Sequence, residues 1–219
     1  LPDAALGGEV PMAKQGKTDA KHAPLSLRER NKLRTRQELL QAALEVFAET
    51  GYGSATVEAI ANRAGTSKVT VYTYFPQGRE ELFRVLYEQI NTELVERATD
   101  IYSRDGHFAD RVVGLTRALL EVAERPLIGR FYSIEDPSLD QALNPVRGQA
   151  SRMWSELIAK DLQSAQNESR LASTAAPEAI ATLVVGALRS ALSDVARGWA
   201  RSTDLEEAIE SLVRGLEKR

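Results

Sequence analysis

The sequence predicts an all-α protein of about nine helices, arranged as a three-helix N-terminal unit followed by a C-terminal helical bundle. Apolar residues recur at helical spacing over most of the chain after residue 35. Helix start and stop signals separate these segments, and we find no useful stretch of the apolar–polar alternation that a half-buried strand shows. Hydrophobic residues make up 43% and charged residues 27% of the 219 positions, which is the balance of a globular protein.

Composition excludes several classes of protein. The chain has no cysteine and only two histidines, so disulfide scaffolds, thiolate metal centres and a cysteine nucleophile are excluded, and we expect no metal or cofactor. The longest uncharged apolar stretch, residues 179–188, is about half of what a membrane-spanning helix needs. Since no signal-peptide pattern opens the chain, we expect a cytoplasmic protein without a membrane partner.

The formal net charge of −3 is unevenly distributed. Residues 1–79 carry 11 basic and 8 acidic side chains, whereas residues 80–219 carry 17 and 23. The basic side chains are densest in residues 26–36, where five of them accompany Glu29. Residues 1–25 lack a hydrophobic period and are predicted to form a disordered tail. The acidic balance therefore does not exclude a nucleic-acid site, because binding depends on where the cations lie.

Three helices are predicted in the N-terminal part. Thr35 to Glu38 has the pattern of a capping box, and Gly51 closes the helix that follows it. Thr56 caps a short helix over 57–64, which ends at Gly65. Ser67 caps a third helix over 68–74, and Pro76 and Gly78 end it.

The remaining chain predicts longer helices. A long one covers about 80–102, another 108–124, and a short one 127–134. Proline at the first turn favours helices starting at Pro145, up to about Asn167, and at Pro177. Thr203 to Glu206 is read as a second capping box, opening the last helix.

The segment TVEAIANRAGTSKVTVYTYF, residues 56–75, has the pattern of a helix-turn-helix. Ala61 is small where the two helices cross, and Gly65 suits the positive φ that a sharp turn requires. In this motif the second helix enters the major groove of DNA. The hydroxyl groups and the lysine ammonium of this second helix can bind phosphates and base edges. Together with residues before it, the candidate DNA-binding residues are Arg34, Arg36, Thr56, Thr66, Ser67, Lys68, Thr70, Tyr72 and Tyr74. A solvated charged run at 28–36 and a core position for Tyr74 remain open alternatives.

Residues 34–83 resemble the TetR/AcrR family of bacterial transcriptional repressors. The shared pattern is an Arg-flanked first helix ending in F-x-x-x-G-[YF], a Thr-capped second helix, A-x-x-A-G-x-S, and a third helix ending in Y-x-[YH]-F. The resemblance implies that Thr56, Lys68, Thr70, Tyr72 and Tyr74 contact operator DNA. It also implies a homodimer, a small-molecule effector, and a division into residues 26–79 for DNA binding and 80–219 for ligand sensing and dimerisation.

One segment departs from the family pattern. After Phe75 the family usually has F-x-x-K-E-x-L with the lysine on a phosphate, whereas this chain is one residue longer and has Arg79 at that place. The resemblance therefore does not carry a phosphate contact over to Arg79.

The pocket and the subunit interface are predicted from the C-terminal helices. Aromatic and apolar residues that could line an effector pocket are Phe108, Phe131, Met153, Trp154, Leu183 and Ala187, although such residues are more often plain core. Residues expected at the interface between two copies are Ala179, Thr182, Gly186, Ser190, Ser193, Leu205, Ile209 and Leu212, although the first five could also belong to an ordinary buried helix.

We expect no catalytic site. A di-iron carboxylate bundle needs Glu-x-x-His pairs, which the sequence lacks, and no nucleophile–base pair is supported. The expected function is a ligand-responsive repressor that binds a near-palindromic operator as a homodimer. The alternative is an all-α adaptor that binds protein and not DNA, and salt-dependent DNA binding would separate the two.

Overall fold

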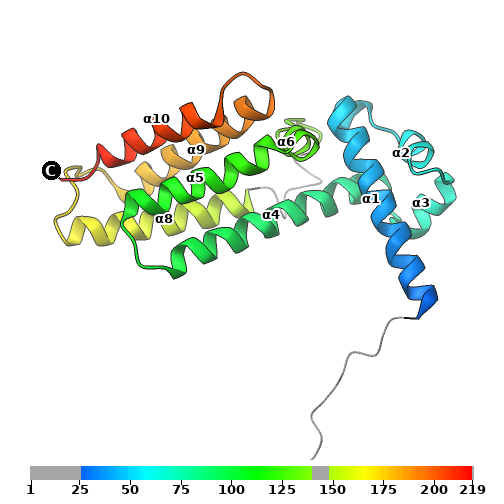
Figure 1. Cartoon of the computed structure of the whole chain (residues 1–219), viewed down its shortest axis with the longest axis horizontal. Helices are drawn as coiled ribbons and strands as arrows, with labels where there is room; N and C mark the ends of the chain where they lie inside the picture. Colours follow the sequence, from blue (N-terminus) through cyan, green and yellow to red (C-terminus); the bar gives the residue numbers. More distant parts are fainter. Residues whose placement is uncertain (1–25, 140–147, 219) are drawn as a thin grey trace, which may run out of the picture.

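A computed structural model describes residues 26–139 and 148–218 of the chain (Figure 1). The described residues form helices and no strand, which confirms the all-α prediction. The tail expected at residues 1–25 and the helix start expected at Pro145 lie outside the described residues. The helices are α1 (Leu27–Ser54), α2 (Val57–Arg63), α3 (Lys68–Tyr74), α4 (Arg79–Ser103), α5 (Phe108–Glu124), α6 (Pro126–Tyr132), α8 (Gln149–Asn167), α9 (Pro177–Ala196) and α10 (Ser202–Arg214).

Helix α1 begins eight residues before the predicted capping box. The Ser26 hydroxyl accepts a hydrogen bond from the Glu29 amide at 3.2 Å, and the Glu29 carboxylate accepts one from the Ser26 amide at 2.8 Å. The capping box is therefore Ser26–Glu29, and the prediction that Thr35 starts the helix is wrong. Both segments have the required spacing, but no glycine or proline interrupts residues 27–34, so the helix extends back to the first cap.

The second predicted capping box is also wrong. Helix α10 begins at Ser202, before Thr203, and no side chain caps its first turn. Arg201 instead holds the carboxylate of Asp204 with two hydrogen bonds, at 3.0 and 2.5 Å. The local pattern at Thr203 therefore identified the helix but not its cap.

The first three helices form a small unit at one end of the molecule (Figure 1). Helix α1 packs on α2, and α2 packs on α3. Regular backbone in α1 is interrupted at Gly51, where φ is +74°, close to the predicted helix end. Gly65 has a φ of +63° between α2 and α3, as the sharp turn requires.

Helix α4 leads from this unit into the bundle formed by α5, α8, α9 and α10 (Figure 1). The short helix α6 contacts α1 as well as α5 and α9, so it also joins the two parts. Phe83 of α4 packs against Phe47 of α1 and Phe131 of α6, with ring centroids 5.0 and 4.5 Å apart. All three rings are buried. They fix α1, α4 and α6 to one another through a shared aromatic core.

Helix α9 is long and apolar enough to span a membrane. Of its most apolar 18-residue segment, 28% is buried inside the chain. Because α9 packs on α8, α5 and α6, one of its faces belongs to the bundle and another stays open.

Candidate functional site

The exposed side of α3 carries the residues expected to meet a nucleic acid. Val71 is fully buried and holds the helix on the core, together with Phe75 at its end. The next residue, Tyr72, is 49% exposed, and the Lys68 side chain is 53% exposed. Thr70 is half-buried. Helix α3 is therefore a short rod at the surface, with one side anchored and the other open to a partner.

Two of the candidate residues build the ends of the helices. The Ser67 hydroxyl accepts a hydrogen bond from the Thr70 amide at 3.2 Å, and the Thr56 hydroxyl accepts one from the Ala59 amide at 3.1 Å. These caps confirm the predicted starts of α3 and α2. In the turn between the helices, the Thr66 amide donates to the carbonyl of Ala61 at 2.9 Å. The hydroxyls of Thr56 and Ser67 therefore have a structural role, because they fix the first turns of α2 and α3.

Lys68 has a partner that the sequence analysis missed. Its ammonium donates a hydrogen bond to the carboxylate of Glu58 in the first turn of α2. The hydrogen bond raises the pKa of Lys68 and lowers the pKa of Glu58. The signal was available, because both residues lie in the first turn of neighbouring helices that meet at a sharp turn.

Arg79 is bound to the protein backbone. Its guanidinium donates to the carbonyl of Ala55 at 3.0 Å and to that of Tyr52 at 3.3 Å, and it lies over the Tyr52 ring at 4.6 Å. The group closes the end of α1 against the start of α4. The arginine at the departure from the family pattern is thus engaged in holding the three-helix unit together.

The remaining basic candidates lie along α1. Arg34 is exposed and 3.6 Å from the carboxylate of Glu38, while the guanidinium of Arg36 lies 5.1 Å above the buried Phe75 ring. In Figure 1 the N-terminal half of α1 extends past α3. Tyr74 is half-buried and packs against the core, which leaves its predicted contact as a proposal only.

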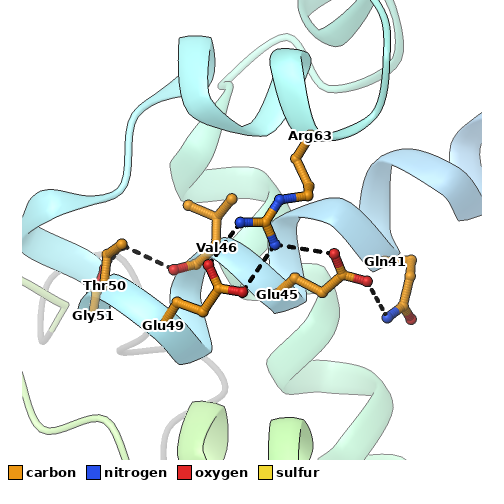
Figure 2. Close-up of polar contacts among 7 residues, drawn as sticks. All are labelled: Gln41, Glu45, Val46, Glu49, Thr50, Gly51 and Arg63. Carbon is orange, nitrogen blue, oxygen red and sulfur yellow. Dashed lines mark hydrogen bonds and ion pairs between the residues drawn. The ribbon is translucent and has the colours of Figure 1, made fainter.

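A charge cluster fixes α2 on α1 (Figure 2). Arg63 at the end of α2 donates to Glu49 at 2.6 Å and to Glu45 at 3.1 Å, and Gln41 donates to the same Glu45 carboxylate at 2.9 Å. Hydrogen bonding to Arg63 lowers the pKa of Glu49, and hydrogen bonding to Gln41 and Arg63 lowers that of Glu45. Since α3 follows α2 directly, this cluster also sets where α3 lies.

Residues 39–86 match the model of bacterial regulatory proteins of the tetR family. Over this segment the chain is therefore similar to TetR-family regulators. A transcriptional regulator from Vibrio harveyi, LuxR, is 31% identical over 93 residues, which are 42% of this chain and 45% of that protein. The fatty acid metabolism regulator protein of Bacillus subtilis is 35% identical over 60 residues, which are 27% of this chain and 30% of that protein. The matches thus span about half or less of these two relatives.

Solved structures extend the likeness of the TetR fold to most of the chain. A TetR-family regulator from Pectobacterium atrosepticum is 26% identical and has a TM-score of 0.61, with 89% of this chain and 99% of that chain covered. A TetR-like regulator from Rhodococcus sp. RHA1 is 23% identical and has a TM-score of 0.68, with 82% and 93% covered. The TetR family is one of regulators and not of enzymes.

The bundle contains a cavity of about 1010 Å³ between α4, α5, α6, α8 and α9. Of the six predicted pocket residues, only Trp154 lines it. Phe131 and Phe108 are buried in the core and Leu183 is 75% exposed on α9, so none of the three lines this cavity. Met153 and Ala187 are half-buried and are absent from the lining. Tyr87, Tyr132 and Arg189, which the sequence analysis did not select, do line the cavity.

The predicted interface residues separate into three groups. Ala179, Thr182 and Leu212 are exposed, and Leu205 is half-buried. Gly186, Ser190 and Ser193 line the cavity, so they lie on the wall between it and the open face of α9. Ile209 is buried within the subunit, unlike the other predicted interface residues. Its side chain is used in packing α10 on the bundle.

Proposed function

We propose that the chain is a DNA-binding transcriptional regulator in which residues 26–79 bind DNA and residues 80–219 sense a ligand and dimerise. The observation that carries the proposal is α3, which has Val71 anchored in the core and Lys68 and Tyr72 open to solvent. Side chains of this chemistry reach phosphates and base edges when such a helix lies in the major groove. Basic residues on the neighbouring half of α1 supply further phosphate contacts.

The protein acts as a homodimer on a near-palindromic operator in this proposal. The open apolar face of α9, with Leu183 and Ala179 exposed, supports a second copy as its partner. Two α3 helices related by the dimer axis would then enter successive major grooves roughly 34–36 Å apart. A cytoplasmic location follows from the same role.

A small molecule in the bundle cavity relieves repression. The cavity wall includes Tyr87 of α4 and Tyr132 of α6, and these two helices also pack on the aromatic core shared with α1. A ligand that prefers one arrangement of α4 and α6 would shift the population of α3 positions. Its leverage is limited to the difference in its affinity for the two arrangements.

Selection of bound duplexes from a random DNA pool tests the proposal. The expected result is enrichment of a palindromic sequence whose binding weakens steeply with salt. Truncating Tyr72 to Ala should weaken binding to the enriched sequence and relax its specificity. If no duplex is enriched and binding shows no salt dependence, the chain is instead an all-α adaptor for another protein.

A further inference from the structure

The cavity wall formed by α9 carries a cation without a partner. Arg189 lines the cavity, and its guanidinium forms no hydrogen bond or ion pair within residues 26–139 and 148–218. Most arginines of the bundle behave differently, since Arg97, Arg111 and Arg125 each hold a carboxylate at 2.8 Å or less. Arg189 is therefore available to an anion that enters the cavity.

The surroundings of Arg189 divide into a polar and an apolar part. Ser193 lies one turn further along α9, on the same side as Arg189. The Tyr132 hydroxyl donates to the Asn91 side chain at 2.6 Å, and the positive charge of Arg189 acts on that hydroxyl, opposing the rise in its pKa that burial causes. Apolar side chains from α4, α5, α8 and α9 complete the wall, namely Leu94, Leu119, Trp154, Val185, Leu188 and Leu192.

Two carboxylates also line the cavity, and one of them, Glu135, lies at its rim. Glu135 lies beyond the end of α6, and Asp194 and Arg197 lie in the last turn of α9. Glu135 and Arg197 also line a second groove beside Trp199, which places them at the rim. Neither carboxylate contributes to the pKa of Tyr132, whereas Arg189 does. Arg189 is thus the cation that acts on the tyrosine hydroxyl.

We infer that the cavity binds an amphipathic anion, with its carboxylate on Arg189 and Ser193 and its hydrocarbon body against the apolar wall. A guanidinium offers paired donors that fit the two oxygens of a carboxylate. The volume of about 1010 Å³ suits an extended single chain, because ligand cavities commonly reach about this size. The inference rests on the proposed function, since it names the chemistry of the ligand that the regulator senses.

The two tryptophans of the chain allow a direct test in the full-length protein. Trp154 lines the cavity, while Trp199 is exposed beside Arg197. In a Trp199→Phe background, fluorescence of Trp154 reports binding of decanoate, of neutral 1-decanol and of cationic decyltrimethylammonium. The expected order of affinity is decanoate first, then 1-decanol, then decyltrimethylammonium.

Substitution of Arg189 decides where the anion binds. Arg189→Gln should weaken decanoate binding about tenfold, while 1-decanol binding stays within about twofold. Arg104→Gln is the control, because Arg104 is exposed and pairs with Asp100 away from the cavity. Equal binding of the three probes, an equal loss for decanoate and 1-decanol, or no binding at all would overturn the inference.

The DNA measurement is separate and distinguishes the two proposals. If decanoate binds through Arg189 but leaves DNA affinity unchanged, the ligand class stands and the regulatory proposal fails. If the protein selects a DNA palindrome but decanoate does not depend on Arg189, the regulator stands and the ligand class is wrong.

Discussion

The Lys68 ammonium at the first position of α3 is hydrogen-bonded to the Glu58 carboxylate in the first turn of α2. Both side chains are more than half exposed, so the pair lies on the surface of α3 that we propose to meet DNA. Binding a phosphate through Lys68 therefore requires the ammonium to exchange one anion for another. Glu58 also places a negative charge beside the approaching backbone, which opposes binding to any sequence.

Glu58→Gln should raise affinity for duplex DNA of random sequence. The gain is expected to be at most about fivefold, because an exposed ion pair contributes little. Lys68→Gln should lower affinity and reduce the slope of log K against log salt by about 0.9, as one lost phosphate contact requires. Fluorescence anisotropy over a salt series measures both effects. An unchanged affinity in Glu58→Gln together with an unchanged salt slope in Lys68→Gln would show that α3 does not meet DNA through this pair.

Gly78→Ala should destabilise the three-helix unit more than Gly65→Ala does. Both glycines have positive φ, at +61° and +63°, which alanine adopts only with strain. At Gly78 an added Cβ would also lie 3.0 Å from Tyr72 Cε1 and 3.2 Å from Val57 Cγ2, whereas at Gly65 it meets nothing within 4 Å. Urea denaturation measures the free energy of unfolding that each variant loses relative to the wild type. Equal losses would mean that Tyr72 moves aside freely, and the position of its ring on α3 would then be unconstrained.

The sequence correctly predicted most helix bounds and caps, because local residue patterns determine them. The 3.6-residue period and the flanking prolines and glycines gave α5 as Phe108–Glu124 and α3 as Lys68–Tyr74, which agree with the structure. The caps at Ser67 and Thr56 were also predicted correctly. The cap at Thr35 was wrong because an equally good cap lay upstream with nothing between them to end a helix.

Long-range contacts account for the rest. Arg79 reaches carbonyls 24 to 27 residues earlier, and no local pattern specifies those acceptors. Phe131 and Tyr132 are neighbours in α6, but Phe131 points into the aromatic core and Tyr132 lines the cavity. Which of them faces a ligand depends on how α6 packs between α1, α5 and α9, so composition alone could not choose between them.

Glu93→Gln should remove a contribution to stability that depends on pH. Arg125 holds the Glu93 carboxylate with two hydrogen bonds, at 2.8 and 2.5 Å, which lower the pKa of Glu93 below its ordinary value of 4.5. A lowered pKa in the folded state contributes stability above pH 4.5, and this contribution is lost as pH falls through the folded value. The variant should be less stable than the wild type by up to about 1 kcal/mol at pH 7.

Urea denaturation between pH 7 and pH 3.5 measures this difference, which should shrink at the acidic end. Glu96→Gln on the same helix is the control, because Glu96 is exposed and holds no ion pair in the described part of the chain. A difference between wild type and Glu93→Gln that stays constant down to pH 3.5 would contradict the assignment to the Arg125 pair.

Leu183→Glu should convert a dimer into monomers. Leu183 is 75% exposed in the middle of the most apolar helix of the described chain, and Ala179, Thr182 and Gly186 surround it on the open face. A carboxylate there would be buried against its own copy across a dimer axis, which costs far more than an isolated surface substitution. Light scattering should give twice the 24.1 kDa chain mass for the wild type and the single mass for the variant. Affinity for a palindromic duplex should fall with the loss of the second α3, while Leu27→Glu, at another exposed leucine, should stay dimeric. If Leu183→Glu keeps the doubled mass, the two copies meet through another surface and the open face of α9 has a different occupant.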